Sequence, residues 1–207
     1  MTSRKLGATA AAAATLLFAT TAFAQTAAAP AVTHGAAIAG VCYLSTQEGL
    51  ANSTVGKHVN TRMQQLIAQV NSELQPEQTI IENEGKAIEA GRATMDQNTL
   101  TTRATAWQTR LGNFQRLAQQ RERELEMTQQ KAVSRVLQEM DPIAKQQYQA
   151  RRCSILLDRS SVMLGNPAMD LTPAVIQGLN ARIQTFAFER ERMAAAATPA
   201  ATTPARK

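Results

Sequence analysis

The sequence predicts an α+β fold that is mostly helical, in which a small β-sheet body carries a long antiparallel α-helical coiled-coil hairpin. Two long segments have apolar residues at helical spacing, and short apolar runs typical of strands lie on either side of them. Aromatic residues make up only 4% of the 207 residues, whereas Gln, Ala, Glu and Arg are common. This composition suits solvated helices better than a large globular core.

The first 24 residues predict a signal peptide. Arg4 and Lys5 form a positive n-region, an apolar run follows, and Ala22-Phe23-Ala24 has the small-x-small pattern of a cleavage site. A membrane anchor is the alternative, but the run is short and rich in Ala and Thr, and a span needs about 20 strongly apolar residues. We therefore expect export with cleavage after Ala24, and a flexible leader over residues 25–37.

The first part of the body and the first long helix follow this leader. Residues 38–44 predict a strand, and the body segment extends to residue 53. Pro76 interrupts the helix after it, and either breaks it or opens a second helical segment. The polar stretch 91–98 suits a reversal of the chain. From Thr54 the apolar residues of this helix recur every three or four positions: Val59, Met63, Leu66, Ile67, Val70, Leu74, Ile80, Ile81 and Ile88.

The second long helix completes a hairpin over residues 54–149. Asp141-Pro142 predicts an N-cap followed by a proline, and so a kink or a restart of this helix. Its first apolar residues alternate in steps of four and three, which is the heptad seam of a coiled coil: Leu100, Ala104, Trp107, Leu111, Phe114 and Ala118.

The second part of the body covers residues 150–190. It begins with an alternating segment typical of a strand, and residues 161–164 predict a return strand. Thr172-Pro173 predicts the start of a closing helix, whose apolar face runs to Phe186. Residues 191–207 predict a disordered tail. Because a sheet of about three strands is marginal by itself, we expect an oligomer.

Motifs for catalysis, cofactors and metals are absent from the sequence. It contains no phosphate-binding glycine loop, dinucleotide-binding motif or nucleophile elbow, and His34 and His58 have no Cys or His at ligand spacing. The Glu clusters at 82–89 and 122–126 fit solvated helix faces better than paired acid and base groups. We therefore expect a protein that is not an enzyme and has no cofactor.

The net charge gives no support for a nucleic-acid partner. The signal peptide holds two of the 22 Lys and Arg residues, so its removal lowers the net charge from +6 to +4. This net positive charge is too small to indicate a dedicated nucleic-acid-binding protein.

Cys42 and Cys153 lie in predicted strands on either side of the hairpin. An exported protein enters an oxidising compartment, where a disulfide between them would tie the sheet to the base of the hairpin. Two separate buried thiols are the alternative. The even number of cysteines favours the bridge.

Candidate contact residues lie along the hairpin. Flexible thioethers suit adaptable apolar contact, although each methionine fits the seam at least as well. Residues 54–96 hold four Lys and Arg against six Asp and Glu, whereas residues 97–152 hold ten against five. A basic second arm would attract acidic clients or acidic lipid headgroups; charge matching between the arms is the alternative. The candidates are Met63, Met95, Met127, Met140, Arg110, Arg116 and Arg135.

The C-terminal part contains a series of recognisable segments: Ser154-Ile-Leu-Leu-Asp158, Ser161-Val-Met-Leu, Asn166-Pro, and Asp170-Leu-Thr-Pro-Ala-Val-Ile-Gln-Gly-Leu179. A hydrophobic strand ending in Asp, a second strand, a turn and an Asp-x-Thr motif that opens the last helix resemble the Skp (OmpH-like) family of periplasmic chaperones. With the signal sequence, the N-terminal strand and the hairpin, the resemblance covers about residues 38–190. Pro76, Pro142 and the long tail depart from the family's pattern.

This resemblance implies a function as well as a fold. It implies a jellyfish-like homotrimer in the periplasm, whose three hairpins surround a cavity that holds unfolded outer-membrane β-barrel proteins. It also implies a holdase that works without ATP, which agrees with the absence of a nucleotide loop. The alternative is a structural coiled-coil adaptor or spacer of the cell envelope that binds one folded partner.

Overall fold

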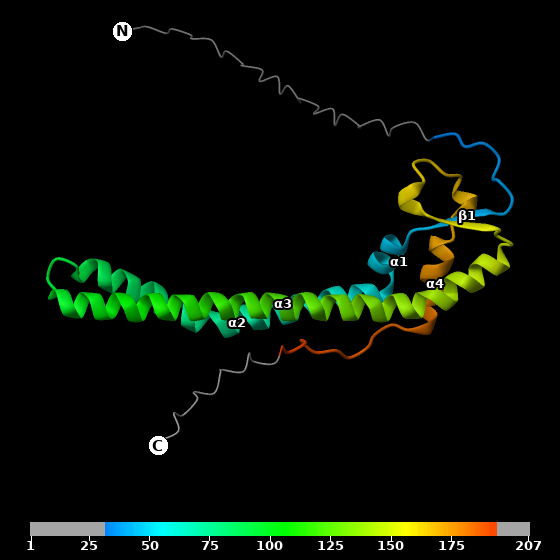
Figure 1. Cartoon of the computed structure of the whole chain (residues 1–207). Helices are drawn as coiled ribbons and strands as arrows, with labels where there is room; N and C mark the ends of the chain where they lie inside the picture. Colours follow the sequence, from blue (N-terminus) through cyan, green and yellow to red (C-terminus); the bar gives the residue numbers. More distant parts are fainter. Residues whose placement is uncertain (1–31, 194–207) are drawn as a thin grey trace, which may run out of the picture. The chain divides into compact units, whose positions relative to one another are not determined.

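The computed structural model describes residues 32–193. All of its helices and strands belong to one compact unit of the chain, which begins at His34. The predicted signal peptide (residues 1–24), the leader up to residue 31 and the tail from residue 194 lie outside the described residues. The fold is mostly helical α+β, as predicted (Figure 1). Its elements are β1 (Val41–Leu44), α1 (Thr46–Asn52), α2 (Thr54–Gly91), α3 (Gln97–Ala150), β2 (Ile155–Asp158), the short 3-10 turns η1 (Arg159–Ser161) and η2 (Pro167–Met169), and α4 (Thr172–Arg182).

The sheet of the body pairs the two strands that flank the hairpin. β1 and β2 are parallel, with Val41 opposite Ile155 and Leu44 opposite Asp158. Parallel strands need a long crossover connection, and α1, α2 and α3 supply it here. The hairpin is therefore an insertion between neighbouring strands of one small sheet.

The predicted return strand over residues 161–164 is wrong, and the sheet has two strands. The Asp158 carboxylate accepts a hydrogen bond from the Ser160 N–H at 2.8 Å, which opens the 3-10 turn η1 in place of a tight strand reversal. The chain returns to the sheet only at Asp170, which makes an isolated parallel bridge with Tyr43.

The arms α2 and α3 lie side by side and antiparallel (Figure 1). Their 38 and 54 residues correspond to lengths of about 57 and 81 Å at 1.5 Å per residue. α2 begins at a tight corner, where the Ser53 hydroxyl accepts a hydrogen bond from the Gly56 N–H. Gly56 is required there, because a Cβ would lie 1.6 Å from the Leu50 carbonyl oxygen. Among residues 32–193, no helix is long and apolar enough to cross a bilayer.

Both prolines lie inside continuous helices, Pro76 in α2 and Pro142 in α3. The predicted helix restart at Asp141 is wrong, since the Asp141 carboxylate pairs with Lys145 Nζ at 2.7 Å and caps no new helix. A proline removes one backbone hydrogen bond, but Met140 and Ile143 on either side of Pro142 are buried and hold α3 to the body. Figure 1 shows α3 changing direction toward its C-terminal end, the part that contains Pro142.

The chain leaves helical structure earlier than the apolar pattern predicts. α4 ends at Arg182, so Phe186 lies beyond it. Residues 183–193, which we call the strap, run without helix or strand along the hairpin (Figure 1). The strap includes residues 191–193, which were predicted to belong to the tail, and hydrogen bonds at Glu191 and Met193 hold them to α3.

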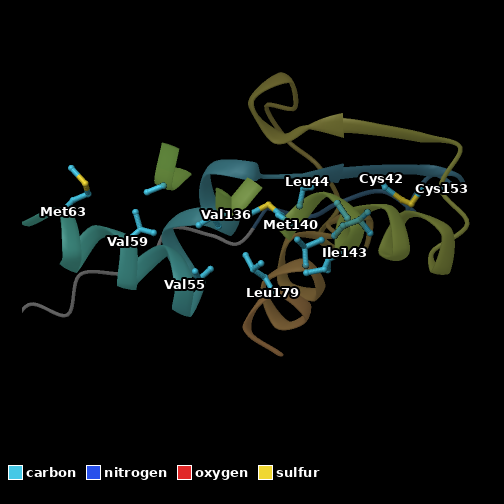
Figure 2. Close-up of a cluster of buried hydrophobic side chains, with 14 of the residues drawn as sticks. Cys42, Leu44, Val55, Val59, Met63, Val136, Met140, Ile143, Cys153 and Leu179 are labelled. Carbon is cyan, nitrogen blue, oxygen red and sulfur yellow. A yellow bond between two sulfur atoms is a disulfide. The ribbon is translucent and has the colours of Figure 1, made fainter. Parts of the chain in front are cut away.

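The core lies where the base of the hairpin meets the body (Figure 2). β1, both arms and α4 all contribute to it, and Cys42 and Cys153 are joined there by a disulfide with a Cα–Cα distance of 5.8 Å. The buried apolar residues are Cys42, Leu44, Val55, Val59, Met63, Leu66, Ala132, Val136, Met140, Ile143, Ala144, Cys153, Leu171, Val175 and Leu179.

Candidate interaction surfaces

The hairpin divides into two halves that differ in burial. We define the basal half as residues 54–81 and 124–150, next to the body, and the distal half as residues 82–123, which include the reversal. No residue of the distal half is buried. All buried residues of the two arms belong to the basal half: Val55, Gly56, Val59, Met63, Leu66, Val70 and Ile81 in α2, and Glu124, Thr128, Ala132, Val136, Met140, Ile143 and Ala144 in α3.

Polar contacts join the arms where the distal half begins. Trp107 Nε1 donates a hydrogen bond to the Ile81 carbonyl at 2.9 Å, and the indole lies against Gly85, where a Cβ would come within 3.3 Å of Nε1. Arg110 makes a two-point ion pair with Glu77, at 2.6 and 2.9 Å. The hydrogen bond between them lowers the pKa of the Glu77 carboxyl and raises the pKa of the Arg110 guanidinium.

The candidate arginines differ in how free they are to contact a client. Arg110 is occupied by the other arm, and Arg135 pairs with Glu139 in its own helix at 2.8 Å. Arg116 and Arg123 are exposed and form no ion pair within residues 32–193. Arg123 was not among the predicted contact residues, because the Glu and Arg residues around it were interpreted as an ordinary solvated helix face.

The candidate methionines lie mostly inside the protein. Met63 and Met140 are 7% and 3% exposed, which leaves them little surface for a client. Met127 is half-buried on α3. Met95 is also half-buried and lies in the reversal, with its thioether against Gly91.

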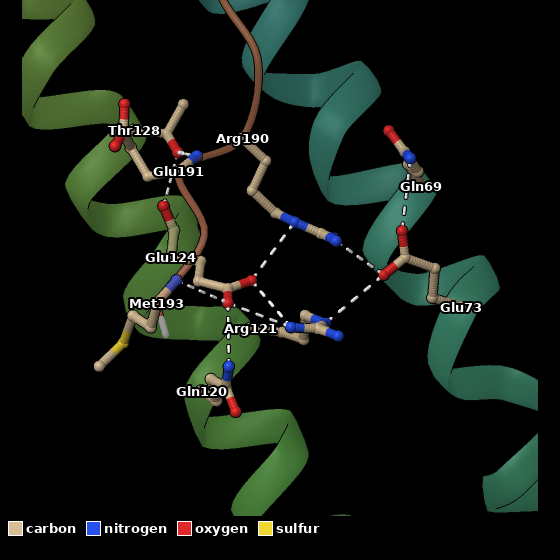
Figure 3. A network of polar contacts seen from close by, with 9 residues as sticks. All are labelled: Gln69, Glu73, Gln120, Arg121, Glu124, Thr128, Arg190, Glu191 and Met193. Atoms are coloured by element: carbon tan, nitrogen blue, oxygen red, sulfur yellow. Dashed lines mark hydrogen bonds and ion pairs between the residues drawn. The ribbon is translucent and has the colours of Figure 1, made fainter. Parts of the chain in front are cut away.

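A buried polar network lies where the strap passes the arms (Figure 3). The Glu124 side chain is only 1% exposed, and its carboxylate accepts hydrogen bonds from Gln120 Nε2 at 3.1 Å, from Arg121 Nη1 at 3.0 Å and from the Met193 N–H at 3.1 Å. Burial raises the pKa of this carboxyl, but these donors and the Arg121 charge outweigh it, and the pKa is lowered. The prediction that Glu124 belongs to a solvated face is wrong, because the strap covers it.

Arg190 of the strap joins the two arms inside this network. Its side chain is 6% exposed, with Nη2 at 2.9 Å from the Glu73 carboxylate of α2 and Nε at 3.4 Å from the Glu124 carboxylate of α3. Arg121 Nε lies 3.5 Å from the same Glu73 oxygen. Two carboxylates and two guanidinium groups therefore balance each other between the arms.

The body exposes apolar side chains around β2. Every residue of β2 is exposed, including Ile155, Leu156 and Leu157. In the loop after it, Met163 and Leu164 are 95% and 72% exposed. Exposed apolar residues gathered in one region are typical of an interaction surface.

A sequence model of the OmpH-like outer membrane proteins matches residues 40–179, which include both strands, the whole hairpin and most of α4. The chain belongs to the OmpH-like family. A crystal structure described as that of a candidate outer membrane chaperone (OmpH-like) from Caulobacter crescentus CB15 is similar, with 47% sequence identity and a TM-score of 0.69 over 79% of this chain and 96% of that chain. No curated protein matches the chain.

The OmpH-like family is a periplasmic chaperone family and not a family of enzymes. Its sequence model ends at Leu179, so the strap and its Arg190 lie beyond the matched residues. The buried network between the arms is thus completed by a residue beyond the part of the chain that the family's sequence model matches.

Proposed function

We propose that this OmpH-like protein is an ATP-independent holdase that binds unfolded outer-membrane β-barrel proteins and prevents their aggregation. The observation that carries the proposal is the distal half of the hairpin, in which no residue is buried. Its heptad residues, such as Leu111 and Phe114, face one partner helix only and stay half-buried. Such a surface offers many apolar contacts that are individually weak.

Weak contacts suit a chaperone without an energy source. Because the sequence has no nucleotide loop, clients must leave by equilibrium exchange or by folding. Several arms that bind one client raise the effective concentration of each contact, and so give avidity without any strong single contact.

We propose a homotrimer to supply these arms. A two-stranded sheet is marginal by itself, and the apolar residues of β2 and of the loop after it are exposed in the single chain. Burial of this surface between copies would place several hairpins around one space.

The test is an aggregation assay with a denatured outer-membrane β-barrel protein, with and without ATP. We expect protection that does not depend on ATP and that extends to several unrelated barrels. The double variant Met163→Asp/Leu164→Asp should lose both the oligomer, measured by light scattering, and the protection. Ile80→Asp, also at an exposed apolar site but in the hairpin, should keep the oligomer. Protection that requires ATP, or specific binding of one folded partner, would contradict the proposal.

A further inference from the structure

The strap is bound to α2 through its backbone as well as through side chains, among them the Glu189 carboxylate, which pairs with Arg62 Nη2 at 2.8 Å. His58 Nε2 lies 3.0 Å from the Phe186 carbonyl oxygen, and Arg62 Nε donates to the Phe188 carbonyl at 3.3 Å. Because a carbonyl can only accept, the His58 ring nitrogen is the donor. The two carbonyls are two residues apart, as expected of an extended chain that presents one edge to α2.

The backbone of the strap is also bound by α3. Thr128 Oγ1 accepts a hydrogen bond from the Glu191 N–H at 2.8 Å, and the Glu124 carboxylate accepts one from the Met193 N–H at 3.1 Å. These N–H groups are again two residues apart. Side chains of the arms thus recognise carbonyls on one stretch and N–H groups on the next, which any extended peptide could offer.

Burial along the strap follows the period of a β-strand. Phe186 and Phe188 are half-buried and the Arg190 side chain is buried, whereas Ala187 and Glu189 between them are exposed. The two phenylalanine rings pack against each other at 5.3 Å and lie on the edge of the core. The strap therefore places an aromatic–x–aromatic–x–basic pattern against the arms.

The arms present negative charge to the basic residue of this pattern, Arg190. Without Arg190, the carboxylates of Glu73 and Glu124 would share the single cation Arg121. Within residues 32–193, Nε and Nη1 of Arg190 make no hydrogen bond, so its contribution is that of a cation between two carboxylates. Any extended segment with a cation at this position would meet the same need.

We propose that His58, Arg62, Glu73, Glu124 and Thr128 form a binding site for extended peptides of the pattern aromatic–x–aromatic–x–basic. The strap fills this site within its own chain, and segments of a client displace it. The occupant is a transmembrane strand of an unfolded β-barrel, because such strands alternate in polarity with a period of two and carry aromatic residues near their ends. This inference rests on the proposed holdase function and gives it a defined peptide site.

The test uses the full mature chain and a fluorescent peptide of residues 183–193. In the variant Phe186→Ser/Phe188→Ser/Arg190→Ser the strap loses all three inserted side chains. We expect the peptide to bind this variant at least about tenfold more tightly than it binds the unmodified protein, where the tethered strap competes at high effective concentration. Adding Thr128→Val removes the hydroxyl that accepts a hydrogen bond from the Glu191 N–H, and should weaken peptide binding several-fold.

The matched control is Thr105→Val, since the Thr105 hydroxyl also donates to the carbonyl four residues earlier, but lies in the distal half. It should leave peptide binding unchanged. If the triple variant loses its helical circular dichroism, Arg190→Ser alone gives the same comparison with a smaller change in affinity.

Competition then identifies the occupant. A barrel-strand peptide with the aromatic–x–aromatic–x–basic pattern should displace the probe at least about tenfold better than the same residues in scrambled order. The proposal is overturned if the folded triple variant does not bind the probe, or if the patterned and scrambled peptides displace it equally well. It is also overturned if an unlabelled peptide of residues 183–193 displaces the probe but the barrel-strand peptide does not, because the occupant is then the strap of another copy of this chain. Because the peptide assay involves no aggregation, its result is independent of whether the protein protects denatured barrels.

Discussion

The basal and distal halves of the hairpin are built from the same two helices but differ in what surrounds them. Val136 in the basal half is fully buried in the core that the arms form with β1 and α4. Leu111 in the distal half follows an equally regular apolar repeat, yet stays half-buried because α2 alone faces it. Helical periodicity therefore identifies the side of a helix that meets another element, but the number of elements around it decides whether that side becomes a core.

The largest contrast between the halves should appear in stability. Leu66→Ala empties a site that is 1% exposed and should lower the free energy of unfolding by about 2–5 kcal/mol. Leu117→Ala, at a distal site that is 36% exposed, should cost less than about 1 kcal/mol. Chemical denaturation followed by circular dichroism, at one fixed protein concentration, measures both. Equal losses would show that the distal half is part of the same cooperative core.

The disulfide should contribute a comparable amount at the base of the hairpin. Cys42 and Cys153 are 111 residues apart, and a bridge that closes so long a loop restricts the unfolded chain. Cys42→Ser/Cys153→Ser should lower the free energy of unfolding by about 2–4 kcal/mol. Peptide mapping without reductant checks the bridge itself. Free alkylation of both thiols in the native protein would contradict it.

The difference between local pattern and surrounding structure also decides which features of the fold the sequence could predict. The hairpin, its reversal and the strand before it follow from local spacing, since period and turn residues are properties of neighbouring positions. Of the two outcomes predicted at Pro142, a kink or a restart, the restart was wrong, because the penalty of the proline is local whereas the packing of Met140 and Ile143 that offsets it comes from the body. The predicted third strand failed for a different, local reason, because the Asp158 side chain favours a turn over a strand reversal.

The strap site could not be predicted from sequence. Glu73, Glu124 and Arg190 belong to three separate segments, and each one looks like an ordinary surface charge in its own segment. Only the fold brings them together, and it buries the side chains of Glu124 and Arg190. The alternation of Phe186 and Phe188 was the available signal, but Phe186 was interpreted as the end of the apolar face of the closing helix.

Acid should weaken the basal half through Glu124. A carboxyl whose pKa is lowered by folding stabilises the protein above its unfolded pKa of about 4.3, and this stabilisation is lost as the pH falls through the lower folded pKa. Glu124→Gln should therefore cost about 1–3 kcal/mol near pH 7, and the difference from the unmodified protein should shrink below about pH 4. Denaturation at pH 7, 5 and 3.5 measures it. A difference that stays constant with pH would mean that the Glu124 charge plays no part.

The smallest effect on stability, and the most specific effect on function, should come from the exposed cations of the distal half. Arg116 and Arg123 have no ion-pair partner within residues 32–193, unlike Arg110, whose reversal would also break its pair with Glu77. Arg116→Glu/Arg123→Glu should change the free energy of unfolding by less than about 0.5 kcal/mol, as is usual for surface sites.

Because charge mainly sets encounter rates, this variant should capture an acidic unfolded client several-fold more slowly at low salt and at nearly the normal rate at high salt. Stopped-flow fluorescence with a labelled barrel protein measures the rate. Lys57→Glu/Arg151→Glu is the matched control, because it reverses two exposed cations at the base of the hairpin that also form no ion pair within residues 32–193, and it should keep the normal rate. If both variants slow capture equally, the net charge of the protein and not the distal half guides the client.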